Sequence, residues 1–341
     1  MNPPLDSLRP HWFVACTAAE VRARPLARTI LGVPIVLFRS AGKIAALIDR
    51  CPHRNAALSQ GRVTGDLIEC PYHGWSFDGG GACRRIPGMV GACEHPHQTA
   101  ETAHAIEREG LVWVCVGKSE TAPETLPVSR HVALGDARFD TFLWAATARC
   151  ALVDGIENLL DACHPHFAHA GLVRRTQKRR TVDVTVRRDA DGVEAIYHEN
   201  ARPDGLIPRL LEGQRLTSVG RFFLPATAQL EYTGADGPRF LLTSMFTPCD
   251  ERTVLIHSCI STPRKLAPAW LKKTILRAIF GRVLRQDQDV LRRQQENIDR
   301  FGGPKFTSTP LDVMRPHILY FLSHPDRATR TDHAATLQME L

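Results

Sequence analysis

Cys51-Pro52-His53-Arg54 and Cys70-Pro71-Tyr72-His73-Gly74-Trp75 are the two stretches that decide how the first third of this 341-residue chain folds. Each stretch offers one thiol and one imidazole, and the proline after each cysteine stiffens the turn. Two cysteines and two histidines can bind zinc in a tetrahedron. They can also hold a two-iron, two-sulfide cluster, with the thiolates on one iron and the imidazoles on the other. Zinc fingers usually pair Cys with Cys and His with His, so the mixed pairs favour the cluster; zinc and unliganded core residues remain the alternatives.

The segments around these loops predict a small all-β domain. Short strands separated by turns are typical of such domains, and we expect them within 11–15, 31–38, 43–48 and 111–116, with a turn at 79–81. This domain should cover residues 1–118. A stretch rich in Thr, Glu and Pro follows, which predicts a linker over 119–140.

A second set of candidate ligands lies on a predicted helix over 152–164. His164 and His169 are five positions apart, which on an unbroken helix turns them about 140° away from each other. Pro165 lacks an N–H, and its ring crowds the carbonyl group of Asp161. We therefore expect the helix to break near Pro165, so that His169 can turn back and share a metal ion with His164.

Two histidines and one carboxylate on one face of iron leave positions open for oxygen and substrate. The predicted long helix over 269–300 supplies the candidates for the carboxylate. Asp287 falls in its apolar stripe, whereas Asp289 lies on the polar face between Arg285 and Arg292. Because an inward carboxylate is costly unless it is paired or bound to metal, we favour Asp287. Asp289, or a salt-bridged core Asp287, is the alternative.

The second half of the chain predicts an α+β domain over 141–341. Strand-like segments at 182–186, 193–198, 221–224, 229–232, 239–246 and 253–258 precede the long helix. This order predicts an antiparallel sheet packed by helices, in a helix-grip-like arrangement. The expected fold class of the whole chain is thus α+β, with an N-terminal all-β domain.

Composition excludes several classes of protein. Apolar residues make up 43% and charged residues 23%, and the net charge is +7, which is normal for a globular chain. The basic stretch 174–180 has no interleaved aromatic residues, so a solvated turn is favoured over an acidic-partner patch or a nucleic-acid site. No apolar run reaches the length of a membrane span and no signal peptide is evident. Because no such signal is evident, we expect the ten cysteines to be thiols or metal ligands and not a disulfide framework. The expected compartment is therefore the cytoplasm.

These motifs resemble those of the Rieske-type non-haem iron oxygenases, and the likeness extends from Arg28 through Gly79. The motif that contains Asn158, Asp161, His164 and His169 is similar to that of the vanillate and dicamba O-demethylase branch. The resemblance implies a [2Fe-2S] cluster and a mononuclear Fe(II) held by His164, His169 and Asp287. It also implies that Asp161 links His164 to His73 of a neighbouring subunit, or merely fixes the His164 tautomer. Asn158 would be a pocket group near the iron, or a packing residue of the helix.

The same resemblance implies a function. The chain would be a terminal oxygenase that uses O₂ and electrons from a separate reductase or ferredoxin, because no dinucleotide fingerprint is present and NAD(P)H should bind elsewhere. The expected reaction is monooxygenation of a small aromatic or cyclic compound, by O- or N-demethylation or hydroxylation. Ring dihydroxylation, a non-catalytic Rieske electron carrier and a zinc-stabilised interaction protein are the alternatives. Two linked domains should hold the metals apart within one chain, so a head-to-tail homotrimer is expected.

The substrate pocket is the least defined part of the prediction. The stretch 205–211 and the strand 222–229 are candidates for an apolar wall. Arg209, Arg215 or Arg221 could meet a carboxylate, although a surface position is favoured for each. His166 is expected to be exposed or to make a local hydrogen bond.

Overall fold

The computed structural model describes residues 4–90, 98–117, 136–173, 179–201, 215–264, 268–324 and 326–341. These residues form two compact units. The first contains residues 4–117 together with 247–251, and the second contains the remainder. Within the described residues, no helix is both long enough and apolar enough to cross a membrane.

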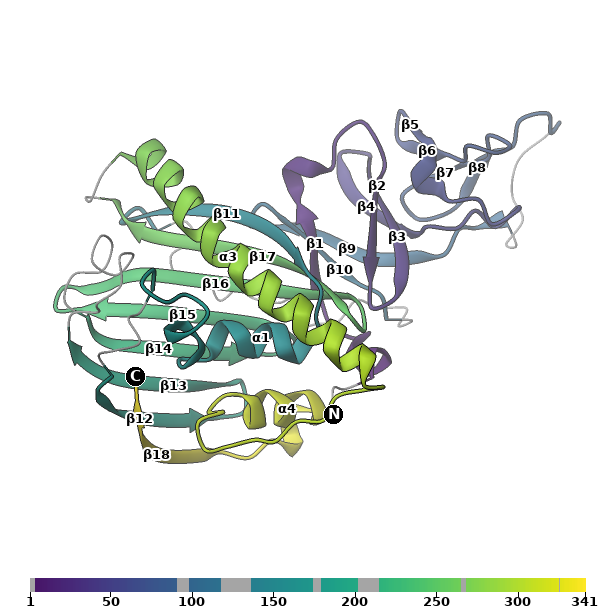
Figure 1. The fold of residues 1–341 in the computed structure, drawn as a ribbon. Helices are drawn as coiled ribbons and strands as arrows, with labels where there is room; N and C mark the ends of the chain where they lie inside the picture. The colour runs from purple at the N-terminus through teal and green to yellow at the C-terminus, as the bar shows by residue number, and fades with distance from the viewer. Residues whose placement is uncertain are drawn as a thin grey trace. The chain divides into compact units, whose positions relative to one another are not determined.

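The first unit is built from two antiparallel sheets. The six-stranded sheet has the order β1-β10-β9-β4-β3-β2 and the four-stranded sheet the order β5-β6-β7-β8 (Figure 1). The apolar run in β3 is buried on both faces from Ile35 to Phe38, which places it at the core. The strands are β1 (Phe13–Thr17), β2 (Leu26–Ile30), β3 (Val33–Ser40), β4 (Lys43–Ile48), β5 (Arg62–Thr64), β6 (Leu67–Glu69), β7 (Ser76–Phe77), β8 (Cys83–Arg85), β9 (Thr102–Arg108) and β10 (Leu111–Cys115).

The second unit is an eight-stranded antiparallel sheet with helices on one face. Its order is β11-β17-β16-β15-β14-β13-β12-β18. In β12 the alternation of apolar and polar residues buries Val182, Val184 and Val186. The strands are β11 (Phe139–Ala148), β12 (Thr181–Arg188), β13 (Gly192–Ala201), β14 (Arg215–Phe223), β15 (Thr227–Gly234), β16 (Gly237–Asp250), β17 (Thr253–Pro263) and β18 (His333–Glu340).

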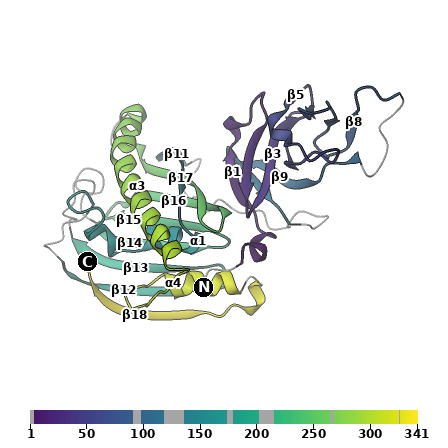
Figure 2. The ribbon, with the colours of Figure 1, turned by 45° about the vertical axis from the view of Figure 1, so that its right-hand side comes forward.

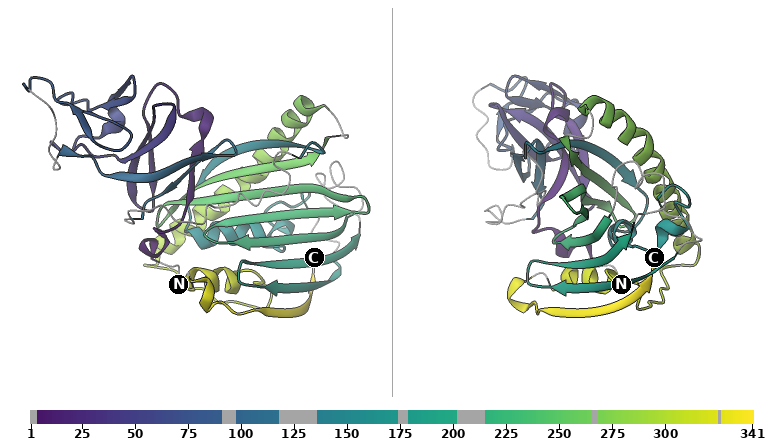
Figure 3. Two further views of the ribbon diagram at one scale, coloured as in Figure 1. Left: turned by 180° about the vertical axis from the view of Figure 1, so that it is seen from behind. Right: turned by 90° about the vertical axis from the view of Figure 1, so that its left-hand side faces the viewer.

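Among the described residues, three helices cover the same face of this sheet: α1 (Leu152–Leu160), α3 (Ala269–Arg300) and α4 (Arg315–Ser323). The long helix α3 runs obliquely across the sheet beside α1 (Figures 1 and 2), and the opposite view shows the strands in front of the helices (Figure 3, left). Arg315 on α4 is buried and pairs with Asp154 at 2.9 Å and with Glu157, both on α1. These ion pairs tie the two helices together, so α1 is held firmly against its neighbours.

The predicted fold class is confirmed: strands dominate the N-terminal part, and an antiparallel sheet packed by helices follows. The long helix agrees with the prediction at both ends. The helix predicted over 152–164 is wrong at its end, since α1 stops at Leu160 and a 3-10 turn occupies His164–His166. Strands β11 and β18 and helix α4 were not predicted. Of the predicted linker, 119–135 lies outside the described residues, and Phe139 and Asp140 begin β11.

A pH-sensitive contact in this unit gives a first prediction. Burial, together with Arg188 and His333, lowers the pKa of His317 to about 4, and Arg188 Nη1 lies 3.3 Å from His317 Nδ1. Between about pH 6.5 and pH 4, the unfolded chain therefore binds a proton at His317 that the folded chain does not bind. As a result, the free energy of unfolding keeps its full value above about pH 6.5 and decreases as the pH falls toward 4. His317→Gln should reduce the loss between pH 7 and 5 by about 1–2 kcal/mol, with allowance for the partly exposed ring.

Thermal unfolding of the two proteins at each pH measures this difference. His198→Gln, at an exposed position of β13, is the matched control and should leave the pH dependence as in wild type. Identical curves for wild type and His317→Gln would contradict the assigned role of His317.

Candidate functional site

Two loops of the first unit share one backbone design. In each, the cysteine N–H donates to the carbonyl five residues later, at 2.8 Å for both Cys51 and Cys70. The N–H of the fourth residue after each cysteine, Asn55 or Gly74, donates back to the cysteine carbonyl, at 2.9 and 3.1 Å. Asn55 and Gly74 have φ angles of 60° and 71°, a conformation that Asn and Gly adopt most readily. The two loops thus hold their cysteines in the same backbone arrangement, whereas the histidine is the second residue after Cys51 and the third residue after Cys70.

The four candidate ligands of these loops lie close together. Cys51 and Cys70 are buried and interact with each other, and burial together with Cys70 raises the pKa of Cys51 to about 11. The rings of His53 and His73 have their centroids 4.5 Å apart at an angle of 63°. Burial and the nearby His73 lower the pKa of His53. The buried Nδ1 of His53 has no hydrogen-bond partner among the described residues.

This donor set fits an iron–sulfur cluster. An unpartnered buried imidazole nitrogen is costly unless something binds it, and a coordinating metal deprotonates a thiol that burial otherwise keeps neutral. Trp75 stacks on the His53 ring, with centroids 4.6 Å apart and planes 6° from parallel. The stacking fixes the orientation of the ring and shields one of its faces.

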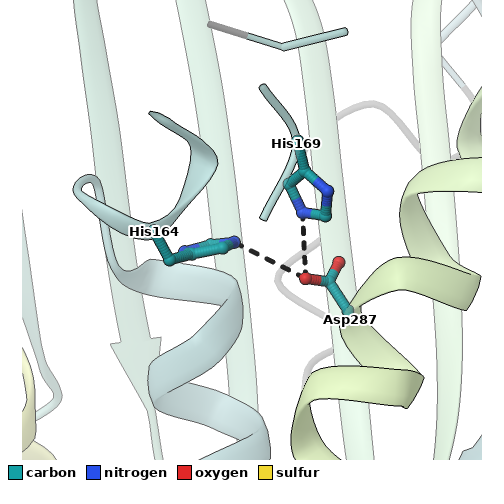
Figure 4. A group of neighbouring side chains, drawn as sticks. All are labelled: His164, His169 and Asp287. Atoms are coloured by element: carbon teal, nitrogen blue, oxygen red, sulfur yellow. Dashed lines mark hydrogen bonds and ion pairs between the residues drawn. The ribbon is translucent and has the colours of Figure 1, made fainter. Parts of the chain in front are cut away.

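The second unit brings His164, His169 and Asp287 together. One ligand atom of each lies within 4.8 Å of the others, and Figure 4 shows the three side chains pointing toward one another. Asp287 Oδ1 is 2.9 Å from His169 Nε2 and 3.6 Å from His164 Nε2. His164 follows α1, and Asp287 comes from α3. His169 is 2% exposed.

The hydrogen bonds behind the two imidazoles indicate a cation site. His164 Nδ1 lies 3.0 Å from the carbonyl oxygen of Asp161, which can only accept, so Nδ1 carries the proton. His169 Nδ1 lies 2.9 Å from Gln286 Oε1, which favours the same tautomer. Both Nε2 lone pairs then face the Asp287 carboxylate. Three converging acceptors repel one another unless a proton or a metal ion lies between them, and two histidines with one carboxylate fit iron.

The electrostatics of this group agree with a cation site. Burial opposes a charge on His164, but hydrogen bonds with Asp161 and Asp287 outweigh it and raise the pKa of His164 to about 9. Burial is likewise outweighed at Asp287, where His164 and His169 lower the pKa of the carboxyl group. Positive charge is therefore stabilised here, and a divalent ion would take the place of the protons.

A cavity of about 200 Å³ opens beside this group, within the second unit. His164, His169, Asp287 and Asn158 lie on its wall, and most of the remaining wall is apolar. The sheet and α3 contribute Trp144, Leu230, Phe240, Ile260, Phe280 and Val283 among others. The volume is below the range of about 300–1,000 Å³ of pockets for drug-sized ligands, which favours a small substrate.

Two family models match the chain. Residues 11–100 match the Rieske [2Fe-2S] domain, and residues 148–315 match the vanillate O-demethylase oxygenase C-terminal domain. The chain belongs to the Rieske-type non-haem iron oxygenases. Members of this family combine a [2Fe-2S] cluster with a mononuclear iron, and each matched segment contains one of the two groups of candidate ligands.

Similar proteins include other Rieske oxygenases. The oxygenase component of dicamba O-demethylase from Stenotrophomonas maltophilia is 35% identical over 164 residues, which is 48% of each chain. Methylxanthine N3-demethylase NdmB from Pseudomonas putida is 29% identical over 84% of this chain and 81% of that protein. The dicamba monooxygenase structure with bound dicamba covers 93% of this chain and 96% of its own, with 21% identity and a TM-score of 0.77. The alignment with dicamba O-demethylase thus spans about half of that relative.

Asp161 and Pro165 of this Rieske oxygenase explain the break in the helix. Asp161 is extended and ends α1, and its carboxylate accepts from the N–H groups of Cys163 at 2.7 Å and His164 at 3.1 Å. These bonds start the 3-10 turn that contains Pro165. The expected break therefore comes four residues before the proline, because the Asp161 side chain competes with the helix for backbone donors.

Several pocket predictions are wrong or lie outside the described residues. Arg209 and the stretch 205–211 are outside them, as are 174–178 of the basic stretch. Strand 222–229 does not line the cavity; its neighbours Gly220 and Leu230 do, whereas Phe222 packs against Phe321. His166 is buried, which contradicts the exposed position expected for it and leaves the alternative of a local hydrogen bond. Arg215, expected on the surface, is also buried, and Arg221 pairs with Glu194 and Glu231.

Gln286 contacts one of the candidate ligands, although no pattern in the sequence assigned it a role at the site. It is adjacent to Asp287 on α3, about 100° round the helix, and only its bond to His169 Nδ1 reveals a role. Gln286→Leu should leave the imidazole free to rotate and lower iron affinity or activity about 10–100-fold. Iron content after mild chelation measures this, and retention of iron equal to wild type would contradict it.

Proposed function

We propose that the chain is the terminal oxygenase component of a multi-part system that monooxygenates a small aromatic or cyclic compound. One atom of O₂ enters a C–H bond and the other leaves as water, with two electrons and two protons consumed. When the bond is in an O- or N-methyl group, the product loses formaldehyde and demethylation results; at a ring or side-chain carbon, hydroxylation results. The demethylases among its relatives support this reaction class.

The cofactors would be held by the two groups described above. Cys51, His53, Cys70 and His73 would bind the [2Fe-2S] cluster, in a Rieske domain over 1–118, and a linker over 119–140 would follow. When bound, the cluster would supply single electrons, and the mononuclear iron would supply the activation of O₂.

The catalytic domain would cover 141–341 and bind Fe(II) through His164, His169 and Asp287. Asp161 and Gln286 orient the two imidazoles so that each directs Nε2 at one point. The apolar wall excludes water and positions the substrate, while Asn158 offers an amide at the same cavity.

The observation that carries this proposal is the triad of His164, His169 and Asp287 on the wall of an apolar cavity, in a chain that also carries the Cys/His loops. An electron carrier has no use for a metal triad beside a cavity. Metal and sulfide analysis with EPR of the dithionite-reduced protein tests it, and about three irons and two sulfides per chain are expected. Two irons would indicate a carrier, and zinc without sulfide would contradict the oxygenase.

The partners proposed are a separate reductase or ferredoxin, which takes electrons from NAD(P)H, and two further copies of the chain. In a head-to-tail homotrimer, Asp161 would connect His164 to His73 of the neighbouring subunit. The Asp161 carboxylate is 33% exposed and His73 is exposed, which supports such a contact. A cytoplasmic location completes the proposal.

A further inference from the structure

One wall of the cavity is a stack of aromatic rings. Tyr232 on β15 stacks on Phe240 of β16, with centroids 5.4 Å apart at 21°, and Phe240 stacks on Phe280 of α3 at 5.3 Å and 4°. Phe280 precedes Asp287 by seven residues, or about 10 Å along the helix axis. Strands β14 to β16 are neighbours in the sheet under α3 (Figure 1). Because these rings already stack on one another, a flat ring system between the stack and the metal triad would meet ring edges, and an edge-to-face contact is one of the arrangements that aromatic pairs prefer.

Arg215 extends this stack and is already paired. Its guanidinium lies 3.7 Å from the centroid of the Tyr232 ring, and Nη1 donates to Glu199 at 3.1 Å. Both side chains are buried, at 3% and 6% exposure. The Ser218 hydroxyl donates to the same carboxylate at 2.6 Å. A buried ion pair of this kind is tied to its own partner and does not present a net positive charge to a ligand.

The side chains of the wall offer an anion no cation beyond one that is already paired. Among the described residues that line the cavity, Arg215 is the one Lys or Arg and it pairs with Glu199, Asp161 is acidic, and the Asp287 carboxylate is the counter-charge of the metal ion in the proposed function. Moving a carboxylate from water into apolar surroundings without a counter-charge is costly. Neutral polar groups are served better, because Ser244 and Ser258 lie on the wall with their oxygens 2.8 Å apart. One of these hydroxyls donates to the other, which leaves one O–H for an acceptor on the ligand.

We propose that the substrate is an uncharged, planar aromatic or heteroaromatic molecule with a hydrogen-bond acceptor, and that the Arg215–Glu199 pair excludes carboxylates and sulfonates from the cavity. This inference rests on the proposed function, since it names the substrate class of that site. Arg215 and Glu199 act as specificity residues: Arg215 supports the aromatic wall, and Glu199 cancels its charge.

Matched pairs of acids and amides test the proposal. The probes are 2-methoxybenzoate, 3,4-dimethoxybenzoate and 6-methoxy-2-naphthoate, each compared with its amide, which has nearly the same shape and no charge. Binding to the iron-loaded protein is measured by anaerobic equilibrium dialysis at pH 7.5, where no turnover occurs. At least one amide should bind at least about tenfold more tightly than its acid, equivalent to about 1.4 kcal/mol. Tighter binding of the acids, or no bound amide in the panel, would overturn the proposal.

A variant identifies the residue responsible. Glu199→Gln removes the carboxylate charge that pairs with Arg215, so the preference for amides should shrink at least fivefold. The control is Glu194→Gln, which removes the acid facing Arg221 on the same two strands, away from the cavity; its preference should stay within twofold of wild type. An unchanged preference in a folded Glu199→Gln protein would overturn the role of the pair, and the wild-type comparison decides the substrate class even if that variant does not fold.

The binding test is separate from the test of the proposed function. Amide preference in a protein that never consumes O₂ would leave the substrate class standing and remove the oxygenase. O₂ consumption by a protein that binds the acids more tightly would support the oxygenase and contradict the substrate class. The cation that balances the bound carboxylate would then be the metal or a residue other than Arg215.

Discussion

Asp287→Ala is expected to lower the iron content from about three to about two per chain and leave two sulfides and the EPR signal of the reduced cluster unchanged. Activity should fall by more than about 100-fold, beyond the loss expected when only an outer hydrogen-bond partner of a ligand is removed. The physical reason is the position of Oδ1, which is the nearest anionic atom to Nε2 of both His164 and His169. Without it the site keeps two neutral imidazoles, and the positive charge of the metal loses its counter-charge.

Asp289→Ala is the matched control, two residues further along the same helix. The Asp289 side chain is 61% exposed and pairs with Arg292 at 3.3 Å. A surface pair of this kind contributes little, about 0–1 kcal/mol. Iron content and activity should therefore stay at the wild-type level. Loss of iron from Asp289→Ala, or full iron in Asp287→Ala, would contradict the assignment of the ligand.

Which of these two aspartates lies beside His164 and His169 was predictable because a helix has a fixed period. The apolar residues of α3 define which side faces the sheet, and Asp287 lies in that stripe while Asp289 does not. The loops of Cys51 and Cys70 were predictable for a different reason. There the residue types and their spacing limit the chemistry to very few kinds of site, whatever the surrounding strands do.

The substrate wall was not predictable, since it depends on register between strands. Arg215 and Glu199 meet because β13 and β14 pair, and Tyr232, opposite Ser218 on β14, places its ring against the Arg215 guanidinium. Nothing in the sequence near Arg215 distinguishes a buried arginine from a surface one. Strand β18 was missed for a related reason: most of its side chains are exposed, so it lacks the alternation that marks a half-buried strand.

The position where α1 ends is set by the side chain of Asp161 and not by Pro165, which is the stronger helix breaker. Pro165 is the residue that disrupts a helix most, yet the helix ends at Leu160 because Asp161 accepts from the backbone N–H groups of Cys163 and His164. The same aspartate presents its backbone carbonyl to His164 Nδ1. One residue thus ends the helix, orients an imidazole and keeps part of its carboxylate exposed. The exposed part is what a trimer contact would use.

Subunit mixing is expected to restore activity to two inactive chains if electrons pass between neighbours. A Cys70→Ser chain has no cluster but keeps the metal triad, and an Asp287→Ala chain keeps the cluster but loses the triad. With a different affinity tag on each, purification on both tags yields only mixed trimers. In a head-to-tail ring, one intact triad in each mixed trimer has an intact cluster on its donor side, so about one-third of wild-type activity should return.

The activity of the mixed trimers distinguishes electron transfer between neighbouring chains from transfer within one chain, because neither variant chain has both the cluster and the mononuclear iron. Transfer within a chain predicts no activity in any mixed trimer, and that outcome would contradict the proposed ring. Iron and sulfide analysis of the mixed trimers shows whether the Cys70→Ser chain has folded and kept its single iron. Adding Asp161→Asn to that chain should then abolish the restored activity without loss of iron, since the amide keeps the shape of the contact but not the charge that holds a neighbouring imidazole.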